Sequence, residues 1–69
     1  MKKFCERLKE LRAEKGLTQA QLASETGLSR SGIGFWENGE RVPLATVVIV
    51  LAKYFNVTTD YLLGISDEL

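Results

Sequence analysis

The sequence predicts an all-α fold of five short helices, and two observations support this prediction. Apolar residues recur at intervals of three and four along the chain, and no segment alternates apolar and polar residues as a β-strand does. A hydroxyl residue that can cap a helix, with an apolar residue before it and another four residues after it, occurs at Thr18, Ser29 and Thr58. The length of 69 residues suits one compact domain that comprises residues 1–69.

The first helix is expected over residues 2–14, and Gly16 follows it as a stop. Its apolar side chains recur at helical spacing, at Phe4, Leu8 and Leu11. The second helix is expected to begin at Thr18, because Gln21 lies three residues later and completes a capping box.

The third helix is expected to begin at Ser29 and to end at Gly39. The fourth is expected to begin near Pro43, because proline fits a first helical turn without loss of a hydrogen bond, and to end at Asn56.

The fifth helix is expected to begin at Thr58 and to end at Gly64. The residues after it include Asp67 and Glu68 and have no helical pattern. We therefore expect residues 65–69 to form a frayed acidic tail.

The window from residue 19 to residue 38 has the residues that two crossing helices and a turn require. Ala23 is small where the second helix crosses the first, and Gly27 lies in the turn, where a left-handed backbone favours glycine. Apolar residues occupy the inner faces, at Leu22, Leu28, Ile33 and Trp36. This pattern predicts a helix-turn-helix unit, whose second helix lies in a DNA major groove.

The charge distribution is compatible with DNA binding through one face only. The formal net charge is zero, which by itself argues mildly against nucleic acid. Residues 1–42 hold eight of the nine basic residues and six of the nine acidic residues, whereas residues 43–69 hold Lys53 against three acidic residues. The basic part of the chain therefore includes the predicted helix-turn-helix.

Composition argues against most other kinds of site. The chain has no histidine and one cysteine, Cys5, so we expect neither a disulfide nor a metal site, and we expect Cys5 to be a reduced packing residue. It has no paired nucleophile and base and no phosphate-binding glycine loop, so we expect no enzyme activity and no cofactor. The charged N-terminus does not resemble a signal peptide, and the apolar run Val47–Ala52 is too short to span a membrane.

Two groups of residues are expected to face DNA. Gln19 and the free N–H groups at the start of the second helix suit phosphate, as do Asn38 and Arg41 beyond the end of the third helix. Four residues of the third helix are expected to face outward, opposite Ile33, and to reach base edges: Arg30, Ser31, Gly34 and Phe35. The alternative for each side chain is an ordinary solvated position.

Several segments together resemble the Cro/cI-type (Xre family) helix-turn-helix regulators of bacteria and phages. They are Gly16-Leu17-Thr18-Gln19, Leu22-Ala23, Trp36-Glu37-Asn38-Gly39 and Asp60-Tyr61-Leu62-Leu63-Gly64.

The resemblance implies a compact five-helix, lambda-repressor-like DNA-binding domain in which the second and third helices form the helix-turn-helix. It implies base contacts at Arg30, Ser31, Gly34 and Phe35, and phosphate contacts at Gln19, Asn38 and Arg41. It also implies a structural ion pair between Arg12 and Glu37, and a bacterial or phage-encoded protein that acts in the cytoplasm at the nucleoid.

The expected recognition helix departs from the family pattern, because polar side chains usually occupy positions that are here Gly32, Gly34 and Phe35. Three interpretations remain open. The glycines allow a close approach to the groove, with Phe35 on thymine methyl groups; or base recognition is weak and DNA shape gives specificity; or Phe35 contacts protein instead of DNA.

The fourth helix has more apolar residues than one buried face requires. One stripe is expected in the core, at Val48, Leu51, Ala52 and Phe55. A second stripe, at Leu44, Val47, Val50 and Tyr54, predicts a dimer interface with Val47, Val50 and Tyr54 at its centre, continued by the fifth helix and the tail. The alternative is that the fourth helix is central and covered by the first and fifth helices.

Two classes of function follow from these observations. The first is a sequence-specific regulator of transcription, a repressor that acts as a homodimer on a palindromic operator in double-stranded DNA, without a small-molecule ligand or a membrane. The second is a protein-interaction module on the same fold, similar to an antitoxin or antirepressor, with weak or lost base recognition.

Overall fold

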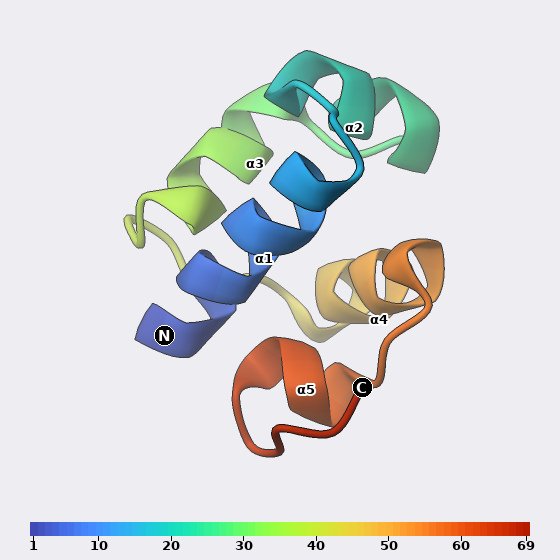
Figure 1. The fold of residues 1–69 in the computed structure, drawn as a ribbon. Coiled ribbons are helices and arrows are strands. Elements are labelled where there is room, and N and C mark those ends of the chain that lie inside the picture. Colours follow the sequence, from blue (N-terminus) through green and yellow to red (C-terminus); the bar gives the residue numbers. More distant parts are fainter.

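The computed structural model describes residues 1–69 and consists of five helices without a β-strand (Figure 1). The predicted all-α fold is confirmed. The helices are α1 (Lys2–Glu14), α2 (Gln19–Thr26), α3 (Arg30–Glu37), α4 (Ala45–Phe55) and α5 (Thr59–Leu63). Helix α1 lies in the middle, with α2 and α3 on one side of it and α4 and α5 on the other (Figure 1). None of the five combines the length and the apolarity that crossing a bilayer requires.

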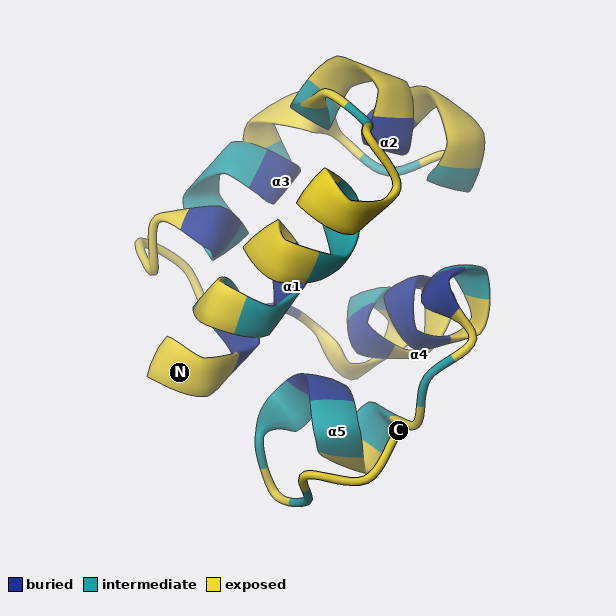
Figure 2. Ribbon diagram, viewed as in Figure 1, coloured by how far each residue is buried: buried dark blue, intermediate teal, exposed yellow.

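The core is a single cluster of apolar side chains to which every helix contributes (Figure 2). Its ten buried members are Phe4, Leu8, Leu22, Ala23, Ile33, Val48, Leu51, Ala52, Phe55 and Leu62. The stripe of α4 that the sequence placed in the core is buried in full. Because α1 contacts both α3 and α5, its buried face joins the two halves of the molecule.

Local capping residues fix the start of three helices. The Thr18 hydroxyl accepts a hydrogen bond from the Gln21 backbone N–H at 3.0 Å, and the Gln21 side chain accepts one from the Thr18 N–H at 2.8 Å, so the capping box is complete. Ser29 and Thr58 accept equivalent bonds from residues three positions later. These three helices begin where the sequence predicted.

The fourth helix begins two residues later than the sequence predicted. Leu44 has an extended backbone, with φ −67° and ψ 154°, and its carbonyl accepts the first helical hydrogen bonds from Val47 and Val48. Pro43 therefore lies outside α4 and is a buried part of the connection from α3. The expectation that Pro43 would occupy the first turn was wrong.

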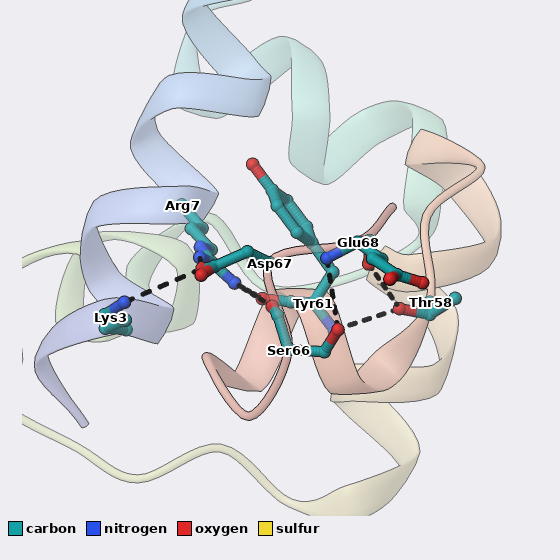
Figure 3. Close-up of polar contacts among 7 residues, drawn as sticks. All are labelled: Lys3, Arg7, Thr58, Tyr61, Ser66, Asp67 and Glu68. Carbon is teal, nitrogen blue, oxygen red and sulfur yellow. Dashed lines mark hydrogen bonds and ion pairs between the residues drawn. The ribbon is translucent and has the colours of Figure 1, made fainter.

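The acidic tail after α5 is bound to α1, contrary to the expectation that it would be frayed. Arg7 donates hydrogen bonds from Nη1 to the Tyr61 and Ser66 carbonyl oxygens, the second at 2.7 Å, and its Nη2 lies 2.6 Å from Asp67 Oδ1 (Figure 3). Its guanidinium also stacks 4.1 Å from the centre of the Tyr61 ring. Because α5 has no basic residue in its last turn, Arg7 supplies the positive charge at that helix end.

Candidate nucleic-acid interface

Helices α2 and α3 meet through a short turn at Gly27. Gly27 has φ 75°, a left-handed conformation that ends α2, and Leu28 follows before the Ser29 cap of α3. Ile33 is fully buried, which fixes the rotation of α3 about its axis. Arg30 and Ser31 are consequently exposed on the other side of α3, and Gly34 and Phe35 are half-buried. These four residues occupy the positions from which the family resemblance implies base contacts.

A buried carboxylate connects the three helices around this unit. Glu37, 3% exposed, accepts hydrogen bonds from Arg12 Nε at 2.6 Å and Arg12 Nη2 at 3.0 Å. Arg12 Nη1 also donates to the Leu17 carbonyl at 2.7 Å. The hydrogen bond to Glu37 raises the pKa of Arg12 above its ordinary value. The structure thus brings Arg12 and Glu37 together as the family resemblance implied.

The same carboxylate also accepts a hydrogen bond from Gln19, a contact that was not predicted. Gln19 Nε2 donates to Glu37 Oε1 at 3.1 Å, so one of its two amide hydrogens is already bonded within the protein. The first residue of α2 is therefore tied to the last residue of α3. No local pattern predicts a bond between residues 18 positions apart.

The two unusual glycines of α3 have different surroundings. A Cβ atom at Gly32 would lie 3.0 Å from Cη2 of Trp36, because the indole ring packs against the Gly32 backbone. A Cβ atom at Gly34 would meet only Gln19 Oε1, at an ordinary 3.6 Å. A side chain at position 32 would therefore force the Trp36 ring to shift by a few tenths of an ångström, whereas one at position 34 would not. The four-residue spacing of Gly32 and Trp36 on one helix was the available signal for this contact.

Phe35 and Arg41 contact each other across the end of α3. The Arg41 guanidinium carbon lies 4.2 Å from the centre of the Phe35 ring, a cation–π contact. The side chains of Arg41 and Arg30 are exposed, and neither guanidinium makes a hydrogen bond or an ion pair within the protein. Asn38, the remaining candidate for a phosphate contact, donates to Glu40 Oε1 at 3.3 Å.

The residues predicted at the dimer interface differ in how far they are exposed. Val50 is 37% exposed, whereas Val47 and Tyr54 are half-buried, and the Tyr54 hydroxyl donates to Glu25 of α2 at 2.6 Å. An apolar groove of about 370 Å³ lies on the other side of α4, toward α5, and was not predicted. Its lining includes Met1, Pro43, Ala45, Ile49 and Leu63.

The family of the chain follows from comparison with known proteins. Residues 8–62 match the family model described as helix-turn-helix. The chain belongs to this helix-turn-helix family. The resemblance to helix-turn-helix regulators noted in the sequence is thereby confirmed.

Relatives and a solved structure agree with this assignment. The chain is 35% identical over 65 residues to YobD of Bacillus subtilis, an uncharacterized HTH-type transcriptional regulator, covering 94% of this chain and 58% of that protein. It is 43% identical to the transcriptional activator BcrR of Enterococcus faecalis, covering 88% of this chain and 30% of that protein.

The crystal structure of the restriction-modification controller protein C.AhdI from Aeromonas hydrophila is similar over most of both chains. The TM-score is 0.79 at 40% identity, with 87% of this chain and 91% of C.AhdI covered. The chain therefore has the DNA-binding fold of helix-turn-helix transcriptional regulators. It spans 58% or less of the two curated relatives named above.

Proposed function

We propose that residues 1–69 act as the DNA-binding domain of a transcriptional regulator that binds a palindromic operator as a dimer and represses by occupying it. One observation carries the proposal. The arginines of α1 donate hydrogen bonds to oxygens of other segments, whereas the guanidinium groups of Arg30 and Arg41 are exposed and have no hydrogen-bond or ion-pair partner in the protein. Two guanidinium groups with free N–H donors beside the recognition helix can donate hydrogen bonds to base edges and phosphates.

The proposed contacts with DNA come from residues of α2, α3 and the loop after α3. Base recognition is assigned to four residues of α3, namely Arg30, Ser31, Gly34 and Phe35. Phosphate contacts are assigned to Gln19, Asn38 and Arg41. Gln19 keeps one free amide hydrogen after its bond to Glu37, which supports its role as a donor at the start of α2.

A second copy of the chain is the proposed occupant of the apolar surface of α4 and α5. Leu44 and Val50 are 74% and 37% exposed, and Ile49, which is 45% exposed, lines the groove on the other side of α4. A two-fold dimer buries the same patch on both protomers and places two recognition helices about 34 Å apart. Val47 and Tyr54 lie at the edge of this surface in the proposal, because both are half-buried within one protomer.

Dimerisation is tested by Val50→Asp, which places a charge in the proposed interface without disturbing the buried face of α4. The variant is expected to sediment as a monomer and to keep its helical circular dichroism. Tyr54→Phe is the matched control at the edge, and it is expected to remain dimeric. A Val50→Asp variant that stays dimeric contradicts the proposed interface.

The proposed function is tested by selection of bound duplexes from a random DNA library, with the affinity then followed against salt. A palindrome with half-sites about one helical turn apart is the expected result. Binding without any enriched sequence, which fades steeply with salt, reflects phosphate contacts alone and contradicts the proposal. The protein-interaction module would then be the better function.

Repression is tested by a reporter gene placed behind the selected site. Occupation of a promoter is sufficient for repression, so lower reporter expression is expected when the protein is present. Higher expression would assign activation instead. In this proposal the protein acts at the bacterial nucleoid in the cytoplasm, without a cofactor or a catalytic step.

A further inference from the structure

We propose that Phe35 is a positioning residue that holds the Arg41 guanidinium beside the recognition helix, so that Arg41 meets DNA phosphate from an ordered position. This inference rests on the proposed DNA-binding function. For Phe35 alone it replaces the base contact assigned above: Phe35 acts through Arg41, whereas base recognition stays with Arg30, Ser31 and Gly34.

The backbone after α3 brings Arg41 back toward Phe35. The Glu40 N–H donates to the Phe35 carbonyl at 2.9 Å, and the Gly39 N–H donates to the Trp36 carbonyl at 3.3 Å. Gly39 has φ 74°, a left-handed conformation that reverses the chain direction at the end of the helix. The loop therefore folds against the last turn of α3, and the residue after Glu40 lies next to the Phe35 ring.

The N–H groups of Arg41 have no partner within the protein. The guanidinium carbon lies over the Phe35 ring, 4.2 Å from its centre, while the side chain is exposed and forms no hydrogen bond or ion pair. The adjacent acid does not neutralise this charge, since Glu40 accepts from the Asn38 side chain and forms no ion pair with Arg41. All donors of Arg41 therefore remain available to an anion.

An ordered arginine binds phosphate more tightly than a mobile one. A free arginine side chain loses rotamer freedom when it is fixed at an interface, and this loss opposes binding. The stack with Phe35 restricts Arg41 before DNA arrives. An aromatic residue at position 35 is explained in this way, because a polar side chain there provides no comparable platform.

The inference differs in a measurable way from a contact between Phe35 and thymine methyl groups. A direct contact makes substitution of Phe35 costly whether or not Arg41 is present. A positioning role makes the cost of substitution depend on Arg41.

The experiment is a double-mutant cycle of Phe35→Leu and Arg41→Gln, measured by fluorescence anisotropy on the duplex selected with the wild-type protein. Phe35→Leu keeps an apolar side chain and removes the aromatic face, and Phe35→Tyr is the matched control that keeps it. We expect Phe35→Leu to weaken binding about two- to fivefold in the wild-type background, the range of an exposed cation–π contact. In the Arg41→Gln background, Phe35→Leu is expected to change the affinity by less than the measurement error.

Two further readouts separate positioning from a general structural effect. Arg41→Gln is expected to lower the salt slope of binding by about one. Phe35→Tyr is expected to bind like the wild type, and the urea midpoint of Phe35→Leu is expected to match that of Phe35→Tyr.

The result that contradicts the positioning role differs from the result that contradicts the proposed DNA-binding function. Equal losses of affinity for Phe35→Leu in both backgrounds overturn the positioning role. If the wild-type protein loses the same affinity on a duplex with uracil in place of thymine, the direct methyl contact is assigned instead. Failure of the wild-type protein to select any sequence counts against the proposed function itself, before the cycle is begun.

Discussion

The arginines of α1 and those of the recognition region differ in what their guanidinium groups contact. Arg7 and Arg12 donate to oxygens of α5, the tail, the α1–α2 turn and α3. Arg30 and Arg41 donate to no protein atom and remain exposed. Position relative to the α2–α3 unit, rather than residue type, therefore separates the arginines that hold segments of the fold together from those whose donors remain free.

The largest expected effect is on stability, from Arg12→Leu. This substitution leaves the Glu37 carboxylate, 3% exposed, without its cationic partner. We expect the free energy of unfolding to fall by about 3–5 kcal/mol, as measured by urea denaturation. Arg30→Leu is the matched control and is expected to change the free energy of unfolding by less than about 0.5 kcal/mol. Equal changes in the free energy of unfolding for the two substitutions would contradict the difference between the two regions.

The next effect is on DNA binding, from Arg30→Ala. We expect the binding free energy on the selected duplex to weaken by about 1–3 kcal/mol, with relaxed preference at one base pair. Anisotropy on duplexes that vary at each position measures both quantities. An equal loss on every duplex would make Arg30 a phosphate contact.

A smaller effect separates the two glycines of α3. Gly34→Ala is expected to raise the free energy of unfolding by about 0.5–1 kcal/mol, because alanine favours a helix. Its Cβ atom meets only Gln19 Oε1, at an ordinary contact distance of 3.6 Å. Gly32→Ala has the same helical advantage, but its Cβ approaches Trp36 to 3.0 Å, so its unfolding free energy is expected to lie below that of Gly34→Ala. Identical thermal midpoints for the two variants would contradict the packing role of Gly32.

The smallest expected effect concerns pH and the tail. The hydrogen bond from Arg7, with a further contribution from Lys3, lowers the pKa of Asp67 below its ordinary 3.8. Near that pH the unfolded chain therefore binds more protons than the folded chain. The contribution of this contact to the free energy of unfolding is present above pH 3.8 and is lost as the pH falls through the lower pKa of the folded state. Carboxyl NMR titration checks this, with Arg7→Gln as the control. The same Asp67 pKa in both proteins would mean that Arg7 does not hold the tail in solution.

Features set by neighbouring residues were predictable from the sequence. The caps at Thr18, Ser29 and Thr58 depend on residues three and four positions away, and each helix begins as expected. The buried stripe of α4 has the helical spacing that the sequence shows at Val48, Leu51, Ala52 and Phe55. The positions of Arg30 and Ser31 on the exposed side of α3 follow from the burial of Ile33.

Features set by distant contacts were not predictable from local patterns, and the Arg12–Glu37 pair was expected only from the family resemblance. Arg7 lies 60 positions from Asp67, so nothing near residues 65–69 indicated that the tail would be held. The bond from Gln19 to Glu37 joins two helix ends that only the packed fold brings together. The apolar groove beside α5 likewise depends on how α4 is placed against its neighbours rather than on the pattern of α4 itself.

The most direct test of the contrast between the arginines is NMR of the four Nε–Hε groups during titration with the selected duplex. We expect the Arg30 and Arg41 signals to shift and sharpen as DNA binds, while the Arg7 and Arg12 signals keep their free-protein positions. Unchanged Arg30 and Arg41 signals in a protein that has bound the duplex would contradict the proposed role of these two arginines.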